Sequence, residues 1–141
     1  STAKGLAGGL PLGATMLGEK VEDVFSCGSN GSTFGGNPAV CAGALSILSR
    51  IDEELLAEVH KKSALIFREL EGAKGIRSVT GMGLMIGIET EKPAGDVAAK
   101  CRANGVLVLT AKTKVRLLPP LNIPEALLKK GVDVIRKVCA E

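Results

Sequence analysis

Hydrophobic residues recur with the spacing of an α-helix in the middle of the chain and again near its C-terminus. The residues that share this spacing are Leu55, Val59, Ile66 and Leu70 in the first segment and Leu128, Val132, Ile135 and Val138 in the second. An α-helix repeats every 3.6 residues, so each set forms an apolar stripe that packs against a core. We therefore predict one helix that begins after Asp52 and another that runs from Pro124 to about Cys139. The solvent-facing side of the first helix is expected to carry Glu58, Lys61, Lys62 and Arg68.

After Gly72 the pattern changes to that of extended strands. Short runs rich in β-branched residues and leucine predict four strands, over residues 77–80, 84–89, 106–109 and 115–118. Between the second and third strands, residues 95–104 are typical of a helix that ends at Gly105, since glycine favours helix C-termini. This part of the chain predicts a small sheet packed with helices.

The first fifty residues lack such regular patterns, because glycine and proline interrupt any helical or strand periodicity. Residues 4–13 and 27–38 predict two loops, with a short strand over residues 13–17 between them. Asn37 is expected to cap the helix that follows the second loop. Residues 39–51 of that helix are apolar almost all round, which predicts burial on most of its faces.

The order of these elements is typical of the α/β and α+β classes. We place a domain boundary near Ile51, where loops and one apolar helix give way to alternating helices and strands. Residues 1–51 are expected to belong to one domain, and residues 52–141 to form a second, small α/β domain.

Composition and charge narrow the range of functions. The 141 residues have a net charge of +3, 45% hydrophobic residues and only three aromatic residues, all phenylalanine. The mild charge argues against a nucleic-acid-binding protein, and the shortage of aromatic rings removes the platforms on which single-stranded bases stack. No apolar stretch reaches the ~20 residues of a membrane span. We therefore expect no nucleic-acid partner and no membrane insertion.

The four cysteines and the single histidine argue against a metal site. Cys27, Cys41, Cys101 and Cys139 are far apart in the sequence, and no Cys-x-x-Cys pair accompanies His60. Free thiols in an apolar chain fit a reducing cytosol, where a buried cysteine acts as a small hydrophobic residue. The sequence therefore predicts a cytoplasmic protein without a bound metal.

Lys4 is the first candidate for catalysis. It stands among small residues at the start of a glycine-rich run, and lysine amines attack carbonyl cofactors to form Schiff bases. A solvated surface lysine is the alternative. Ser1 and Lys4 also match the Ser-x-x-Lys pattern of acyl-transferring serine enzymes, which needs both residues on one helical turn. Gly5, Gly8 and Gly9 argue against such a helix.

A glycine-rich loop before the first predicted helix is a candidate phosphate site. Residues 31–38 place the hydroxyls of Ser32 and Thr33 and several unhindered N–H groups at a helix N-terminus, which attracts anions. An ordinary loop with an asparagine cap is the alternative. A second glycine cluster, from Gly81 to Gly87, has the wrong spacing for a dinucleotide fingerprint and is interpreted as a tight turn or a close strand approach.

Arg116 is a candidate anion-binding residue, because it lies in an apolar strand that ends at two prolines. Its guanidinium matches a carboxylate with two parallel hydrogen bonds, whereas burying it without an anion is costly. The alternative is a strand in which Arg116 faces water. Lys112 and Lys114 lie four and two positions before Arg116, so all three would share one face of an extended strand. A face with three cations favours that alternative.

Three of these segments together resemble the class III pyridoxal-phosphate-dependent aminotransferases. Residues 3–14 resemble the family's cofactor-lysine segment, residues 31–38 its phosphate loop, and residues 116–121 its substrate-carboxylate strand. Their order and separations also fit, and the resemblance covers essentially the whole chain. It implies the C-terminal part of a fold type I transferase, with residues 1–51 as a remnant of the large cofactor-binding domain.

The resemblance also implies roles for single residues. Lys4 would bind pyridoxal 5'-phosphate covalently and carry the proton during transamination. Thr33 would bind the phosphate of the neighbouring subunit's cofactor, and Ser32 would touch substrate across the same interface, which implies a homodimer. Arg116 would hold a carboxylate of the amino-acid or 2-oxo-acid substrate.

Within the family, the start of the chain is most similar to members that transfer the terminal amino group of acetylornithine, or succinylornithine, to 2-oxoglutarate, a step of arginine biosynthesis. Members that act on ornithine or 4-aminobutyrate, and a non-catalytic dimerising domain, are the alternatives. The family carries a long segment before the cofactor lysine, which supplies the acidic partner of the pyridine nitrogen and an aromatic ring that stacks on the cofactor. We therefore expect this chain to be a fragment that is inactive alone.

Overall fold

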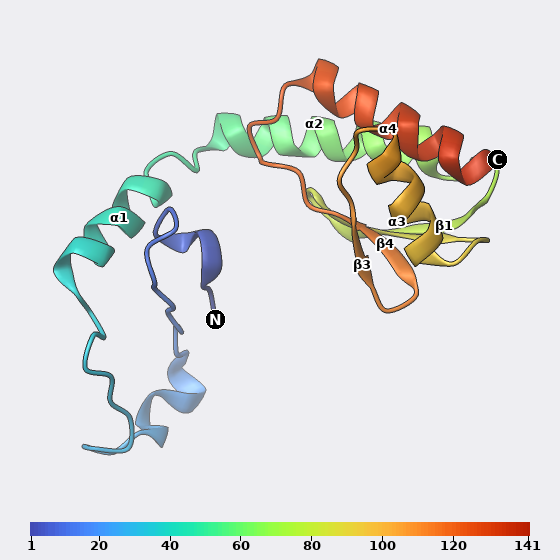
Figure 1. Ribbon diagram of the computed structural model, residues 1–141. Coiled ribbons are helices and arrows are strands. Elements are labelled where there is room, and N and C mark those ends of the chain that lie inside the picture. The colour runs from blue at the N-terminus through green and yellow to red at the C-terminus, as the bar shows by residue number, and fades with distance from the viewer. The chain divides into compact units, whose positions relative to one another are not determined.

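The computed structural model describes all 141 residues, which form two compact units. Unit 1 is Ser1–Asp52 and unit 2 is Glu53–Glu141. Figure 1 shows the course of the chain through both units. The division falls next to the boundary predicted near Ile51. The assignment of each unit to a domain of the aminotransferase fold remains a prediction.

Unit 1 consists mainly of loops around one α-helix. It contains the 3-10 helices η1 (Lys4–Leu6) and η2 (Glu19–Val24) and the helix α1 (Pro38–Leu48). The strand predicted over residues 13–17 is wrong, because only Ala14 forms a β-bridge, with Thr2. The chain reverses between these two residues through a glycine-rich turn, which leaves no second strand long enough to extend the pairing.

The start of α1 confirms the predicted cap. The side chain of Asn37 accepts hydrogen bonds from the N–H groups of Ala39 at 3.0 Å and Val40 at 3.4 Å.

The predicted burial of α1 on most faces is wrong. Ala44 is its only buried residue, and Leu45 is 68% exposed. The apolar residues of α1 therefore stay mostly partly or fully exposed within unit 1.

Unit 2 is an antiparallel sheet covered by helices on one face, as Figure 1 shows. The strands pair in the order β1-β2-β4-β3, and every neighbouring pair is antiparallel. This arrangement confirms the predicted small sheet packed with helices. In chain order the elements are α2 (Glu53–Leu70), β1 (Ile76–Met82), β2 (Met85–Thr90), α3 (Ala94–Ala103), β3 (Leu109–Ala111), β4 (Lys114–Leu117) and α4 (Glu125–Ala140).

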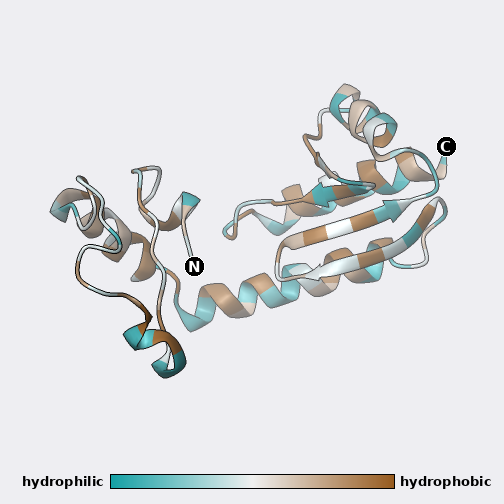
Figure 2. Cartoon of the chain, turned by 90° about the horizontal axis from the view of Figure 1, so that it is seen from below, coloured by the Kyte–Doolittle hydropathy of each residue, from teal (hydrophilic) through white to brown (hydrophobic).

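Successive side chains on the strands of unit 2 point alternately to the sheet face covered by helices and to the open face. On β4, Val115 and Leu117 are buried, whereas Lys114 and Arg116 are half-buried. Figure 2 shows this alternation of hydrophobic and hydrophilic positions along the strands. The hydrophobic effect drives the buried side chains into one core between the sheet and the helices. Its largest fully buried members are Ile66, Leu70, Ile86, Ile88, Val97, Val115, Val132 and Val138.

The helical stripes predicted from the sequence largely face this core. On α4, all four residues of the predicted stripe are buried. On α2, Val59, Ile66 and Leu70 are buried, but the solvent-facing position predicted for Lys62 is wrong. Its side chain is buried, and its ammonium donates a hydrogen bond to the carbonyl of Leu121 at 3.1 Å. The distant segment after β4 therefore covers part of the helix face that the sequence pattern places in water.

The hairpin between β1 and β2 explains the second glycine cluster. Gly81 has φ +152°, and a Cβ atom at this position would lie 2.2 Å from the carbonyl oxygen of Met85. This confirms the interpretation as a close strand approach. Near its other end, β1 carries an irregularity between Ile76 and Ser78, where one extra residue bulges out of the ladder.

The third strand lies later in the chain than predicted. Residues 106–109 were expected to form it, but β3 is Leu109–Ala111. The N–H of Val106 instead donates to the carbonyl of Cys101 at 2.9 Å, which completes the C-terminal turn of α3. Gly105 has φ +80° in that turn, so the predicted glycine stop is confirmed. No helix in the structure combines the length and apolar character needed to cross a bilayer.

Candidate functional site

Lys4 is the first residue of η1 and has an unusual backbone conformation. Its φ of 57° lies in the left-handed region, which costs free energy for a residue with a side chain and is enriched at functional sites. Gly5 and the glycines that follow allow the chain to turn away at once. The side chain is exposed, and its amine forms no hydrogen bond or ion pair within the chain. The amine is therefore open to react with a carbonyl group.

Ser32 and Thr33 lie in a turn before α1. The N–H of Gly35 donates to the carbonyl of Ser32 at 3.1 Å, and the N–H of Asn37 donates to the carbonyl of Phe34 at 3.3 Å. These backbone bonds fix the turn and leave both hydroxyls exposed. Figure 1 shows that η2 and this loop extend away from η1 within unit 1. The structure therefore does not bring the two hydroxyls to Lys4 of the same chain.

The groups in unit 1 have the chemistry that pyridoxal phosphate needs. The free amine of Lys4 can bond an aldehyde carbon, while the hydroxyls of Ser32 and Thr33 can donate hydrogen bonds to phosphate oxygens. The turn also adjoins the N-terminus of α1, where N–H groups and the helix dipole favour anions. The residues present fit the cofactor. The roles that the resemblance implies for Lys4, Ser32 and Thr33 stay predictions.

Arg116 is held by β4 in unit 2, on the sheet face opposite the helices. It is half-buried, and its Nε atom is buried without a hydrogen-bond acceptor anywhere in the chain. A buried donor that lacks a partner costs roughly 1–3 kcal/mol. A carboxylate can accept two parallel hydrogen bonds from a guanidinium, so an anion is a suitable partner for this side chain. The alternative in which Arg116 simply faces water does not account for the buried Nε.

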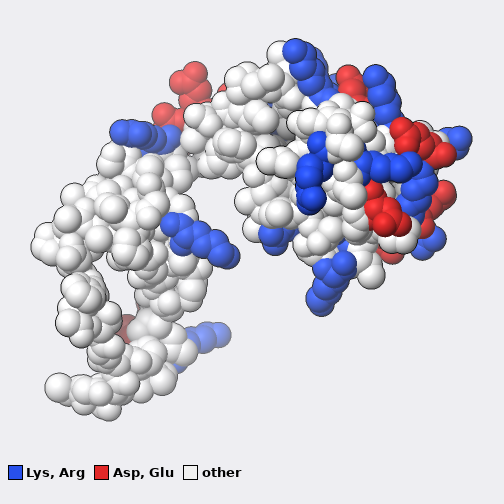
Figure 3. Space-filling model, in the orientation of Figure 1, with Lys and Arg blue, Asp and Glu red and all other residues white.

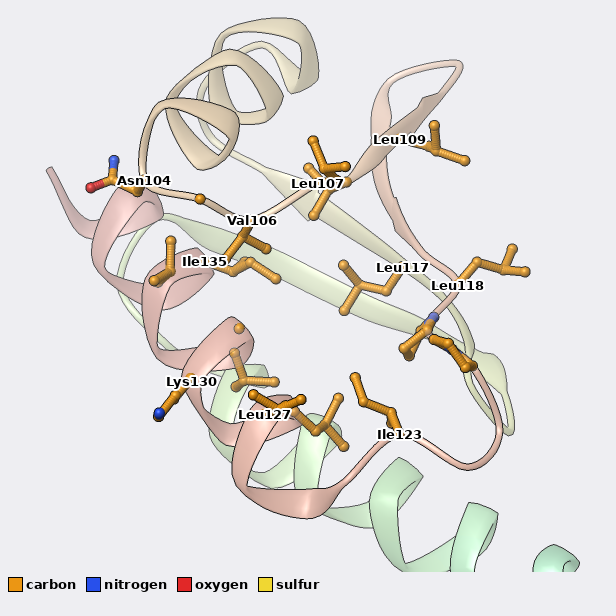
Figure 4. Close-up of a pocket in the computed structure, with 18 of the residues that line it drawn as sticks. Asn104, Val106, Leu107, Leu109, Leu117, Leu118, Ile123, Leu127, Lys130 and Ile135 are labelled. Carbon is orange, nitrogen blue, oxygen red and sulfur yellow. The ribbon is translucent and has the colours of Figure 1, made fainter.

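A largely apolar pocket of about 640 Å³ lies between the C-terminal side of α3, β4 and α4 in unit 2. Figure 4 shows Leu117, Ile123 and Leu127 turned toward the space between these elements, whereas Leu109 and Leu118 point away from it and Lys130 and Asn104 lie at the periphery. The labelled apolar residues are Val106, Leu107, Leu109, Leu117, Leu118, Ile123, Leu127 and Ile135. Sequence reasoning missed this pocket, because it depends on how the loop before β3 packs beside α4.

The other candidates weighed in the sequence are less suited to catalysis. The hydroxyl of Ser1 bonds with that of Thr15 at 2.8 Å, so it is not paired with Lys4 as a serine–lysine mechanism requires. Burial raises the pKa of the Cys101 and Cys139 thiols, that of Cys139 to about 11. Such thiols are poor nucleophiles near neutral pH. No cluster of histidine, cysteine or acidic residues could hold a metal ion.

Comparisons with known proteins agree with this description. The family model for class-III aminotransferases matches residues 1–139. Acetylornithine aminotransferase from Haemophilus ducreyi is 45% identical over 141 residues, which cover 99% of this chain and 36% of that protein. The crystal structure of acetylornithine aminotransferase from Elizabethkingia anophelis has a TM-score of 0.81 and 33% identity, over 96% of this chain and 37% of that chain.

Ornithine aminotransferases have a similar structure. That of Toxoplasma gondii ME49 has a TM-score of 0.78 and 30% identity, over 97% of this chain and 35% of that chain. The chain therefore spans about a third of the length of the relatives it matches. Because the family model covers nearly every residue, the chain belongs to the class-III aminotransferases, a family of pyridoxal-phosphate-dependent enzymes.

Proposed function

We propose that this chain contributes to an enzyme that transfers the terminal amino group of N2-acetyl-L-ornithine to 2-oxoglutarate. The observation that carries the proposal is the 45% identity, along the whole chain, with an acetylornithine aminotransferase. A pathway that makes arginine is the setting we propose for this reaction, and the cytoplasm is the proposed location. Free cysteines throughout the chain are compatible with that compartment.

In this proposal Lys4 has two tasks. Pyridoxal phosphate, when bound, supplies an electron sink for amino-group transfer. Lys4 would hold the cofactor through its Nζ atom and would be released when the amine of the substrate binds there. Once released, Nζ would remove a proton from the substrate carbon that bears the amino group and deliver it to the cofactor rather than back to that carbon, as transfer of the amino group requires. Its free and exposed amine supports both tasks, since neither requires breaking an existing ion pair.

The remaining residues bind and orient. We propose that Arg116 holds a substrate carboxylate, and the unpaired buried Nε supports this role. We further propose that Thr33 binds a phosphate oxygen of the cofactor in a second subunit, and that Ser32 contacts substrate there. The exposed hydroxyls and the neighbouring Phe34, 81% exposed, support a homodimer that uses this loop as a contact. Sedimentation of the full-length protein tests the dimer.

The experiment that tests this function uses the full-length protein with pyridoxal phosphate, acetylornithine and 2-oxoglutarate. We expect turnover, and we expect borohydride to fix a yellow adduct onto Lys4, which peptide mass spectrometry can locate. Lys4→Ala should lower kcat by at least about a hundredfold, the lower end of general acid–base catalysis. The matched control Lys20→Ala removes an exposed lysine of η2 and should leave kcat unchanged. An adduct that persists in Lys4→Ala contradicts the assignment.

Ornithine is the second candidate donor, because solved ornithine aminotransferases share this structure. Parallel assays with acetylornithine, succinylornithine, ornithine and 4-aminobutyrate separate these alternatives. A kcat/KM for ornithine above that for acetylornithine would replace the proposed donor. We expect the 141-residue chain alone to show no turnover, and activity from it would overturn that expectation.

A further inference from the structure

Lys62 is the only charged residue among the buried side chains of the chain. It lies on α2 between Val59 and Ile66, which are buried in the core of unit 2. It takes part in none of the ion pairs of the chain. A buried ammonium is costly unless it gains hydrogen-bond partners. The partner that this ammonium has within the chain therefore indicates what the residue does.

That partner is the segment that joins β4 to α4. The Nζ atom of Lys62 donates a hydrogen bond to the carbonyl of Leu121 at 3.1 Å, and no other side chain donates to residues 118–124. Three of these residues are prolines, which have no N–H group to donate. The one backbone hydrogen bond inside the segment runs from the N–H of Ile123 to the carbonyl of Pro120 at 3.0 Å. Lys62 therefore fastens to α2 a segment that has few hydrogen bonds of its own.

The same segment begins directly after the strand end that carries Arg116. β4 ends at Leu117, which pairs with Ile86 as the last pair of the ladder between β2 and β4. The prolines that follow cannot donate to the ladder, so strand pairing does not hold the chain beyond this point. Arg116 and residues 118–120 also line the same pocket. The position of the segment therefore bears directly on where the end of β4, and with it Arg116, lies.

We propose that Lys62 is a positioning residue, whose hydrogen bond to Leu121 holds the segment after β4 against α2 and thereby keeps Arg116 in place for a substrate carboxylate. This inference rests on the proposed function, and it adds a residue that does not touch the substrate. An apolar side chain of similar length can fill the same space, but it cannot bond the carbonyl of Leu121. Loss of the ammonium should therefore loosen the segment while the core of unit 2 stays folded.

The test measures binding of 2-oxoglutarate and pyridoxal phosphate to the full-length protein by isothermal titration calorimetry. We expect Lys62→Met to weaken binding of 2-oxoglutarate about fivefold, the contribution of one hydrogen bond. The affinity for pyridoxal phosphate should change less than about twofold, because its proposed partners lie in unit 1 and distant sites act independently. Hydrogen exchange at the N–H of Ile123 should become faster, whereas exchange in β2 should stay the same. Lys62→Arg, which keeps a donor, should restore most of both properties.

Lys61→Met is the matched control, because it removes the neighbouring lysine of α2, whose side chain is 73% exposed. It should leave both affinities and the exchange at Ile123 unchanged. Four results would overturn the inference: equal weakening of both ligands by Lys62→Met, the same weakening by Lys61→Met, unchanged exchange at Ile123, or no binding of 2-oxoglutarate by the unmodified protein. Turnover of acetylornithine is measured separately. Turnover without these effects refutes the role of Lys62 alone, whereas the effects without turnover refute the proposed reaction.

Discussion

The two units differ in where their stability can come from. In unit 1, the only buried hydrophobic residues are Ala7 and Ala44, whereas unit 2 buries isoleucine, leucine and valine side chains from all its helices and from three of its strands. Figure 3 shows most of the charged side chains on the surface of unit 2 and a largely uncharged visible face on unit 1. Unit 2 thus has the apolar core and charged surface of a self-contained domain. Unit 1 relies on backbone turns and one capped helix.

The candidate functional groups divide in the same way. Lys4, Ser32 and Thr33 lie on turns of unit 1, whereas Arg116 lies on a strand of unit 2. The turns leave the amine of Lys4 and both hydroxyls exposed. A strand packed on a core holds the backbone of Arg116 in place. The comparison teaches that side chains on turns stay exposed, whereas a strand packed on a core holds its side chains in place.

Truncation of a hydrophobic side chain should change the unfolding free energy much more in unit 2 than in unit 1, and this is the largest difference we expect. Ile88→Ala removes a side chain with no exposed area in unit 2, and we expect a loss of about 2–5 kcal/mol in unfolding free energy. Leu45→Ala removes a side chain that is 68% exposed in unit 1, and its effect should stay within about 0.5 kcal/mol. Urea unfolding followed by circular dichroism measures both. Similar losses from the two variants would contradict the contrast in burial.

Alkaline pH should affect unit 2 through Cys139. Burial raises the pKa of its thiol from 9.0 to about 11, so the folded state keeps a proton that the unfolded state releases in this range. The stabilisation is therefore complete below pH 9 and is lost as the pH rises toward 11. The full loss amounts to roughly 3 kcal/mol.

The decline in unfolding free energy between these pH values should be smaller in Cys139→Ala than in the unmodified protein. Cys27→Ala, which removes an exposed thiol of unit 1, provides the control and should leave the decline unchanged. Because the readout is a slope against pH, the cavity left by Cys139→Ala does not obscure it. An identical slope in all three proteins would show that burial of Cys139 has no part in the pH dependence.

The smallest expected effect concerns the cap of α1. Asn37→Ala removes the acceptor for two backbone N–H groups, and a lost cap of this kind costs about 1 kcal/mol. Hydrogen exchange at Ala39 and Val40 should become faster, while exchange in β2 of unit 2 should remain the same. Asn37→Asp keeps an acceptor and should retain the protection. Faster exchange in both units would indicate that they unfold together.

The sequence predicted the fold correctly where the residues with helical spacing are also the ones that pack into the core. The α4 stripe and the cap at Asn37 follow from helical spacing and side-chain chemistry, and both are present in the structure. Lys62 could not be predicted in the same way, because it is buried by Leu121, which lies 59 positions later. The third strand was misplaced since Val106 closes the last turn of α3 and the strand begins only at Leu109, a difference that β-propensity does not reveal.

The candidate site was predictable to a similar extent. Lys4, Ser32, Thr33 and Arg116 could be chosen from local composition together with a family resemblance. Alternation correctly gave Lys114 and Arg116 one face, but it could not reveal that this face holds a buried guanidinium nitrogen without an acceptor.

The irregular start of β1 has a consequence for self-association. The sheet ends at β1 on one side and at β3 on the other, and such edges offer unpaired backbone groups to foreign strands. β3 is only three residues long, and β1 is interrupted by its bulge beside the exposed charge of Arg77. Each edge is therefore a poor template for edge-to-edge aggregation. The same bulge that disturbs one ladder helps to keep the sheet at four strands.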